Sequence, residues 1–166
     1  MITIQVVYNN LPQHPTKRYK KRDMSKINTI VVHHSATMQK MPKGRQSWMG
    51  TIEQFANYHI DSHNWPGIGY HYVIDPDGVV WKTNPIGVTS WHTGRYNTPS
   101  IGVMLIGNFQ KEKPTGGQIH ALRELVEILK DALPNITKVI GHKQAPGHKS
   151  NACPGSNLMP IVAELS

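Results

Sequence analysis

The sequence has little of three things, and each shortage narrows the class of protein. Its 166 residues include one cysteine, Cys153, so no disulfide can form within the chain and a disulfide-stapled scaffold is excluded. No apolar run approaches the roughly 18–20 residues that cross a bilayer, so we expect no membrane insertion. The first residues lack the basic and apolar regions of a secretion signal, and we therefore expect the protein to accumulate in a cytoplasm.

Acidic residues are also scarce, because 10 Asp and Glu face 18 Lys and Arg, which gives a net charge of +8. This excess favours approach to polyanions such as nucleic acid, anionic membranes or anionic cell-wall polymers. The densest basic cluster is Lys17, Arg18, Lys20, Lys21 and Arg22. The cluster contains one aromatic residue, whereas a binding site for single-stranded nucleic acid needs several aromatic side chains on which the bases stack. We therefore expect no nucleic-acid partner, and a solvated basic loop is the alternative interpretation.

Hydrophobic periodicity predicts one α/β domain with a central mixed β-sheet flanked by α-helices. Helices are expected to begin at Thr51 and Thr115, where a Gln three residues later completes a capping box, and a third helix at 157–165. Residues 1–26 are interpreted as an N-terminal strand and basic arm, and 27–166 as the main body of the domain. Strands are expected at 2–8, 27–33, 68–74, 79–82, 100–106 and 139–140.

Residues able to bind metal lie at the ends of these elements. His33 and His34 follow the second strand, His142 follows the last strand, and Cys153 stands eleven positions later. Imidazole and thiolate together suit zinc, and three protein ligands with an open fourth position are typical of a catalytic zinc site. A water molecule in that position has its pKa lowered to about 7. The spacing alone leaves open which histidine of the pair would bind, and whether Cys153 is a ligand, a nucleophile or inert.

Several motifs occur in one order along residues 27–160. They are similar to motifs of the zinc-dependent N-acetylmuramoyl-L-alanine amidases, in the type 2 amidase and peptidoglycan-recognition-protein superfamily. The motifs are VHHSAT at 32–37, IGYHY at 68–72, HTGRYN at 92–97 with SIGV at 100–103, GH at 141–142 and ACPG at 152–155. Together they are far more specific than any one of them.

The resemblance implies one zinc ion held by His33, His142 and Cys153, since the family motif aligns with the first histidine of the pair. His34 is then expected behind the metal or in contact with substrate. The interval between His142 and Cys153 is longer than in the shorter form of the motif, so this loop carries an insertion. His148 lies within the loop and remains a competing ligand.

The resemblance also implies catalytic and substrate-contacting residues. Tyr70 matches the family's catalytic tyrosine, a phenol able to hydrogen-bond the nucleophile or a developing oxyanion. Lys149 matches a lysine that stabilises the oxyanion in some members, and Asn151 occupies the place of that residue in the alternative alignment. His92 and Asn97, in the long loop at 83–99, are expected to contact the substrate.

The implied activity is hydrolysis of the amide bond between N-acetylmuramic acid and L-alanine in peptidoglycan. The lack of a secretion signal fits a phage or prophage endolysin that accumulates in the host cytoplasm before release, as a monomer. A bacterial autolysin or recycling amidase is the alternative of the same class. A non-catalytic peptidoglycan-binding module of the same fold is the alternative of another class.

Overall fold

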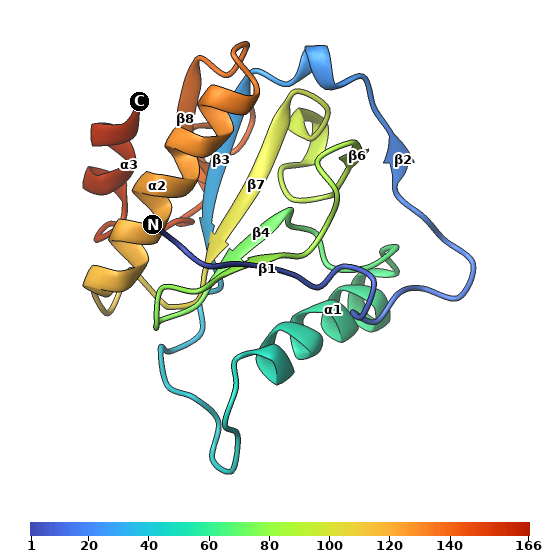
Figure 1. Ribbon diagram of the computed structural model, residues 1–166, viewed down its shortest axis with the longest axis vertical. Coiled ribbons are helices and arrows are strands. Elements are labelled where there is room, and N and C mark those ends of the chain that lie inside the picture. Colours follow the sequence, from blue (N-terminus) through green and yellow to red (C-terminus); the bar gives the residue numbers. More distant parts are fainter.

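The computed structural model describes residues 1–166 as an α/β domain around a six-stranded sheet (Figure 1). The strand order is β1–β5–β4–β7–β3–β8, and a small second sheet pairs β2 with β6. No helix has the length and apolar character to cross a membrane. The strands are β1 Ile4–Val6, β2 Lys20–Lys21, β3 Thr29–His34, β4 Tyr72–Ile74, β5 Val80–Lys82, β6 Val88–Thr89, β7 Ser100–Leu105 and β8 Lys138–Gly141. The helices are α1 Met49–His63, α2 Gly116–Ala132 and α3 Met159–Leu165, with 3₁₀ turns η1 Met24–Lys26, η2 Gly94–Tyr96 and η3 His142–Gln144.

The sheet is mixed, as predicted. Strands β4, β7, β3 and β8 run parallel, β5 is antiparallel to β4, and β1 runs parallel to β5. In the central pairing, Val32 of β3 stands opposite Gly141 of β8. The residues that follow these two positions, His33 and His142, are therefore delivered to the same edge of the sheet.

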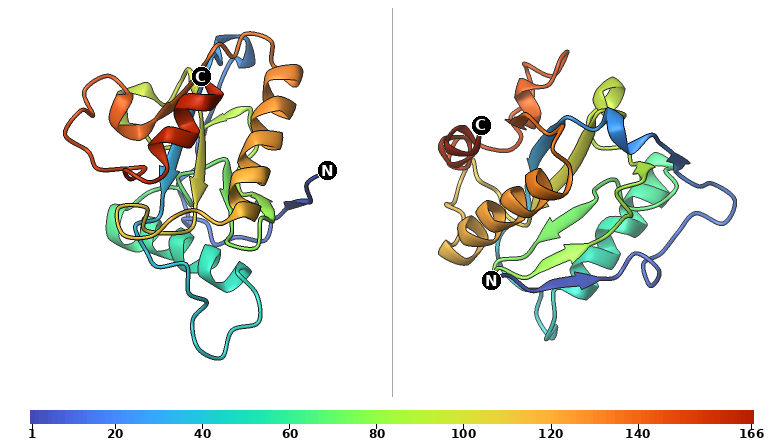
Figure 2. Two further views of the ribbon diagram at one scale, coloured as in Figure 1. Left: turned by 90° about the vertical axis from the view of Figure 1, so that its left-hand side faces the viewer. Right: turned by 45° about the horizontal axis from the view of Figure 1, so that its top comes forward.

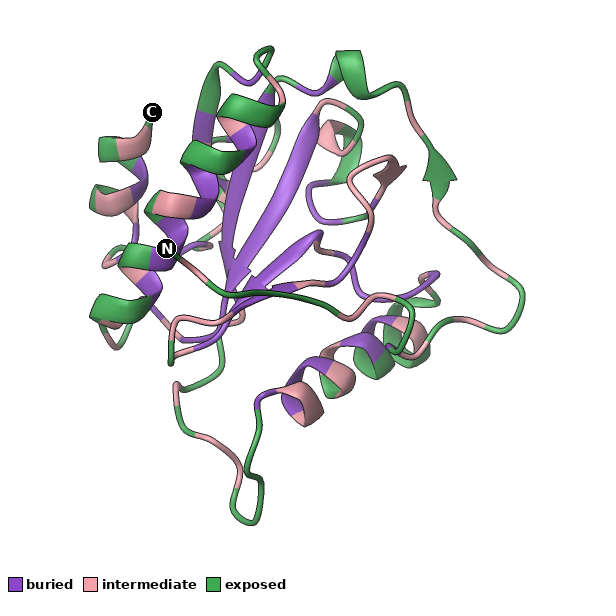
Figure 3. Ribbon diagram, viewed as in Figure 1, coloured by how far each residue is buried: buried purple, intermediate pink, exposed green.

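Helices cover both faces of the sheet (Figure 2). Helices α2 and α3 pack on one face through a core that includes Leu122, Leu125 and Val162, whereas Ile52 and Ala56 of α1 pack on the other face. Strands β3 and β7 are buried along their whole length (Figure 3). Central parallel strands covered on both faces read as continuous apolar runs, which explains why both were visible in the sequence.

The major elements follow the predicted order, and the second capping box is confirmed. Thr115 Oγ1 accepts the Gln118 amide, and the Gln118 side chain accepts the Thr115 amide. The first capping box is wrong, because α1 begins at Met49 with Trp48 as its N-cap and Thr51 lies buried inside the helix. Trp48 is anchored by tertiary packing, and its indole donates to Asp77 Oδ2 at 3.0 Å.

Strand β4 is shorter than the predicted 68–74, because side chains replace part of the ladder. The Gly69 amide donates to Nδ1 of His59, and the Tyr70 carbonyl accepts from Thr83 Oγ1 and Asn84 Nδ2. These bonds fix the backbone on both sides of Tyr70. His59 belongs to α1, and its ring is buried where it makes this contact.

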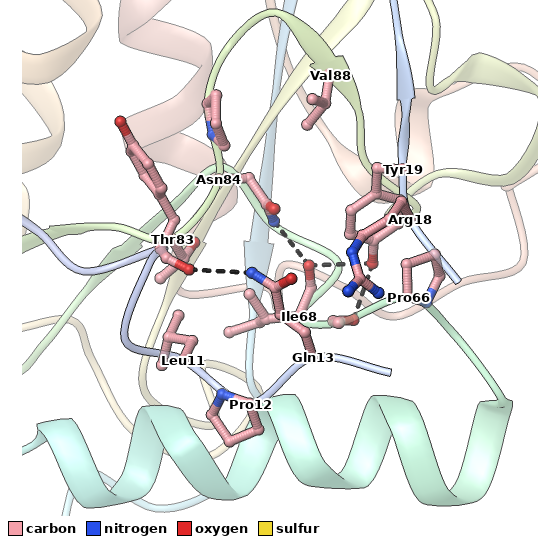
Figure 4. Close-up of a pocket in the computed structure, with 13 residues that line it drawn as sticks. Leu11, Pro12, Gln13, Arg18, Tyr19, Pro66, Ile68, Thr83, Asn84 and Val88 are labelled. Atoms are coloured by element: carbon pink, nitrogen blue, oxygen red, sulfur yellow. Dashed lines mark hydrogen bonds between the residues drawn. The ribbon is translucent and has the colours of Figure 1, made fainter. Parts of the chain in front are cut away.

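The basic arm packs against the body of the domain. The Tyr19 hydroxyl donates to the Gly67 and Ile68 carbonyls at 2.8 and 3.1 Å, and Asn84 Nδ2 donates to the same Ile68 carbonyl. A pocket of about 150 Å³ lies between the arm and these loops (Figure 4). Its lining includes none of the three predicted metal ligands, so it is separate from the site described below.

Candidate metal centre

The structure brings the three predicted ligands together at one edge of the sheet. His33 comes from β3, His142 opens η3 directly after β8, and Cys153 comes from the loop before α3. Their possible ligand atoms all lie within 4.8 Å of one another. Nδ1 of His33 is 3.7 Å from Sγ of Cys153, and the rings of His33 and His142 are 4.6 Å apart between centroids.

Backbone hydrogen bonds fix the thiol of Cys153. Its amide donates to Asn151 Oδ1 at 2.9 Å, and its carbonyl accepts from the Lys143 amide at 2.9 Å. The His34 amide points at Sγ from 3.3 Å. Burial raises the pKa of Cys153 to about 12, and the His34 amide opposes that rise. A bound cation would favour the thiolate further, because a metal deprotonates a coordinating thiol.

The second nitrogen of His33 is held by the 92–93 segment. Nε2 of His33 lies 2.9 Å from Nδ1 of His92 and 3.4 Å from Thr93 Oγ1. This leaves Nδ1 of His33 free to face Cys153. Burial, followed by the neighbouring His92 and His142, lowers the pKa of His33 well below its ordinary value, so the ring is neutral. A neutral imidazole oriented through its far nitrogen is the usual state of a metal-ligating histidine.

Asn97 organises the loop that carries His92. Its Oδ1 accepts the amides of His92 and Thr93 at 2.9 and 2.7 Å. His92 is buried, and its Nε2 lies 3.3 Å from Ser100 Oγ. Both His92 and Asn97 line the cleft at the metal centre, as a substrate-contacting role requires. His92 also orients a candidate ligand, a role that sequence reasoning missed because the two histidines are far apart in the chain.

Arg22 fastens the same loop from the outside. Its guanidinium donates to four backbone carbonyls, those of Ile86, Asn97, Thr98 and Ser100. Its Nη2 also lies 3.1 Å from Nε2 of His71, a buried ring that accepts the Gly102 amide on Nδ1. Burial, followed by the charge of Arg22, lowers the pKa of His71 to about 3. The basic arm is thereby connected to the backbone around the cleft.

His148 lies against His142 rather than within the ligand group. Nδ1 of His148 is 3.1 Å from Nε2 of His142, with ring centroids 4.7 Å apart. Burial, followed by the charges of His148 and His34, lowers the pKa of His142 to about 4. His148 also faces Gly94, where a Cβ would lie 3.3 Å from Nε2 of His148 and where φ is +51°. Glycine is favoured at that position, because the positive φ disfavours other residues and a Cβ would stand tight against the imidazole.

Tyr70 stands beside the candidate ligands. Its ring centroid lies 5.1 Å from that of His33, and its side chain is half-buried. Burial, followed by the charge of Cys153, raises the pKa of Tyr70, so the phenol keeps its proton at neutral pH. A protonated phenol can donate a hydrogen bond.

The cleft at the metal centre has a volume of about 400 Å³ and includes two tryptophans that sequence reasoning did not select. The rings of Trp65 and Trp91 meet edge to face, with centroids 6.2 Å apart. Trp65 precedes Pro66 and Trp91 precedes His92, each in a loop. This placement was the one feature of the sequence that could have identified the two tryptophans as cleft residues. The lining residues are Trp65, Trp91, His92, Gly94, Asn97, His142, His148 and Asn151.

A model of the N-acetylmuramoyl-L-alanine amidase family, Amidase_2, matches residues 23–156. The chain belongs to this amidase family. A peptidoglycan-recognition protein of Drosophila melanogaster is 31% identical over 141 residues, which are 83% of this chain and 74% of that protein. Two solved structures span the domain. Bumblebee PGRP-SA is 25% identical, with a TM-score of 0.83 and 98% and 95% of the two chains covered. The N-acetylmuramoyl-L-alanine amidase LysC from Clostridium intestinale is 27% identical, with a TM-score of 0.76 and 99% and 98% covered.

Enzymes of this amidase family are typically zinc-dependent, and the donor set of this chain fits that metal. Two neutral imidazoles and one thiol converge, and tetrahedral zinc accepts both ligand types. Outer contacts at His92 and His148 orient the two rings, and the His34 amide supports a negative charge on sulfur. The cleft borders the centre, which leaves a side open to substrate.

Three other predicted residues have positions that bear on their roles. Nδ1 of His34 accepts the Phe109 amide at 3.1 Å, and the residue is absent from the cleft lining, as expected of a histidine behind the metal. Lys149 is exposed and also absent from the lining, whereas Asn151 is part of it. In this member of the amidase family, Asn151 therefore stands nearer to the open side of the centre than Lys149 does.

Proposed function

We propose that this protein is a zinc-dependent N-acetylmuramoyl-L-alanine amidase, and that His33, His142 and Cys153 hold one zinc ion. The observation that carries the proposal is the convergence of their ligand atoms within 4.8 Å at the edge of an open cleft. A module that only binds peptidoglycan has no need of a thiol and two oriented imidazoles at this point. The non-catalytic alternative is therefore disfavoured.

When bound, zinc activates a water molecule and polarises the substrate carbonyl. The Tyr70 hydroxyl would donate a hydrogen bond to the carbonyl oxygen as negative charge develops on it. His148 presents an imidazole on the cleft wall, where it can deliver a proton to the leaving amine of L-alanine. Asn151 and Lys149 remain the two candidates for a second contact to the oxyanion.

Peptidoglycan is the proposed substrate. Family members bind fragments of it, and the PGRP-LCa and PGRP-LCx ectodomain complex, 25% identical to this chain, was solved with tracheal cytotoxin bound. The exposed ring of Trp91 offers an apolar face to a sugar, and His92 and Asn97 offer polar contacts beside it. A glycopeptide combines both kinds of surface.

The proposed biological role is that of a phage or prophage endolysin that accumulates in the host cytoplasm before its release. An endolysin amidase from Clostridium intestinale, LysCS, is 27% identical, with a TM-score of 0.75 and 99% of this chain covered. Expression of this chain in a bacterial host should leave the cells intact until the membrane is permeabilised. Lysis without permeabilisation would contradict the role and leave the enzymatic proposal untouched.

The activity is tested by incubating the zinc-loaded protein with purified cell walls and measuring newly exposed amino groups of L-alanine. We expect release that stops with a chelator and returns when zinc is added. A matched variant, Lys111→Gln, changes an exposed charge outside the cleft and should behave as the parent protein does. Zinc-loaded protein that sediments with walls but releases no L-alanine amino groups would establish the binding module instead.

A further inference from the structure

A basic groove lies next to the metal cleft and has no role in the reaction described above. Its volume is about 620 Å³, larger than that of the cleft itself. Strand β2 supplies one wall and pairs with β6, so that Lys20 stands opposite Thr89 (Figure 1). The lining residues are Arg18, Lys20, Lys21, Arg22, Asp23, Lys26, Thr89, Trp91 and Thr98.

Three ammonium groups in this basic groove are free to bind a ligand. Lys20, Lys21 and Lys26 are exposed, and their side chains form no hydrogen bond or ion pair within the protein. The two arginines differ, because Arg18 and Arg22 donate to backbone carbonyls of the protein. The single acid, Asp23, is engaged with Ser25. The unpaired charge of the groove is therefore carried by lysines.

The basic groove and the metal cleft meet at one shared residue. Trp91 lines both of them, and the next residue, His92, contacts the candidate ligand His33. Arg22 holds the groove and the cleft in position relative to each other, because its guanidinium ties the basic arm to the carbonyls of the loop at 97–100. A polymer chain bound at the metal can thus pass over Trp91 and continue among the lysines.

We propose that the basic groove binds a phosphodiester polymer carried by the same glycan strand whose stem peptide is cleaved at the metal. This inference rests on the proposed function, and it defines the preferred substrate as peptidoglycan that bears such a polymer. Binding there would hold the wall beside the cleft without taking part in the chemistry.

The groove chemistry favours phosphodiesters over carboxylates. Arginine matches carboxylates through two parallel bonds, but Arg22 already donates through Nε, Nη1 and Nη2, and Nη1 of Arg18 is bonded to two backbone carbonyls, so neither guanidinium has its whole fork free. Lysine acts as a compact point charge, and it suits single anionic oxygens repeated along a chain. The hydroxyls of Thr89 and Thr98 can donate to such oxygens. Nucleic acid fits less well, because Trp91 is the one aromatic residue in the lining and stacking needs a series of them.

The test compares two triple variants with equal loss of charge. One variant replaces Lys20, Lys21 and Lys26 with Gln, and the control variant replaces Lys40, Lys43 and Lys111, three exposed lysines outside the groove. Binding is measured by calorimetry with synthetic poly(glycerol phosphate) on the zinc-loaded proteins. Poly-L-glutamate and a single-stranded DNA of equal charge serve as competing probes.

We expect the groove variant to bind poly(glycerol phosphate) about tenfold more weakly, since exposed ion pairs contribute modestly each. The affinity of the control variant should stay within about twofold of that of the parent. Its lysines lie outside the groove and act on the polymer only through long-range attraction, which salt screens. The parent should also cleave walls that bear the polymer faster than walls stripped of it. The groove variant should cleave the two kinds of wall at similar rates.

Equal weakening in both variants would overturn the proposal, since net charge alone would then explain binding. Tighter binding of poly-L-glutamate or of DNA than of poly(glycerol phosphate) would overturn the choice of phosphodiester wall polymer. Calorimetry requires no turnover, so failure of this proposal is distinguishable from failure of the amidase activity. A protein that binds the polymer but cleaves no wall would refute the amidase activity. A protein that cleaves walls with and without the polymer equally would refute the proposed role of the basic groove.

Discussion

Replacing Arg22 with methionine should destabilise the protein and weaken the candidate metal centre together. Methionine keeps an unbranched, flexible stem but is shorter than arginine and has no guanidinium. Three of the four carbonyls that accept from it, at Ile86, Asn97 and Ser100, are in partly buried contacts at 2.9, 3.1 and 2.6 Å. The bond to Thr98 is exposed, so water can replace it.

The expected loss follows from these contacts. A hydrogen bond from a charged donor contributes about 1.5–3 kcal/mol, and partial exposure of the bonds reduces that figure. Three partly buried bonds therefore predict a fall of about 2–4 kcal/mol in the free energy of unfolding. Arg22→Lys should recover less than half of it, because one ammonium cannot span several carbonyls at once. Zinc affinity should fall as well, since Arg22 holds the Asn97 carbonyl, and the Asn97 side chain accepts the amide of His92, which contacts His33.

Urea unfolding of the metal-free protein at constant slope measures the change in stability, and zinc titration measures the change in affinity. Arg18→Met is the matched control, because Arg18 lies on the same arm but donates only to the nearby His14 and Lys17 carbonyls. We expect the control to cost less than about 1 kcal/mol. Equal destabilisation by the two substitutions would refute the assignment of Arg22 as the residue that fastens the loop.

Four further outcomes are expected. Cys153→Ala should lose stoichiometric zinc, and retention of one zinc ion per chain by metal analysis would show that the ligand set is wrong. Tyr70→Phe should keep zinc and lose at least about tenfold in turnover, because a donor to the oxyanion is removed; an unchanged rate would exclude that role. Asn151→Ala should lower turnover more than Lys149→Ala, because Asn151 lines the cleft and Lys149 does not. If Lys149→Ala lowered the rate of wall hydrolysis more, the oxyanion contact would belong to the lysine. Burial lowers the pKa of His59 to about 4, so its contribution to stability is present above pH 6.5 and is lost as the pH falls toward 4. Metal-free protein should lose about 2 kcal/mol through this group between pH 7 and 5, so His59→Gln should lose less stability than the parent over that range; an equal loss in the two proteins would contradict it.

The central strands of the sheet were predictable because they are buried on both faces. Strands β3 and β7 are buried along their length and each contains an apolar run, and turn residues mark the hairpin between β4 and β5. The start of α1 was not predictable from the local sequence. Trp48 is held there by the indole contact to Asp77, a residue far along the chain. Local capping signals compete with such tertiary contacts, and here the tertiary contact prevails.

The candidate site was predictable as a set of residues, and less so as a set of contacts. The motifs singled out His33, His142 and Cys153, and strand register explains why the two histidines meet. The bond from His33 to His92 joins residues that no local pattern relates. The loop between His142 and Cys153 has no periodicity, so its sequence could not decide which side chain faces the cleft.

The pairing of β3 with β8 also governs which changes in chain length this site can accept. Register places Val32 opposite Gly141, so the separation of His33 and His142 is fixed by the ladder and not by the residues between the strands. Inserting residues into the loop before β8 lengthens a connection and leaves that separation intact. Cys153 is instead carried by a loop of irregular backbone, and each added residue there shifts the sulfur directly. Variation in length can therefore accumulate before β8, whereas the segment from His142 to Cys153 can change only as a unit that restores the position of the thiol.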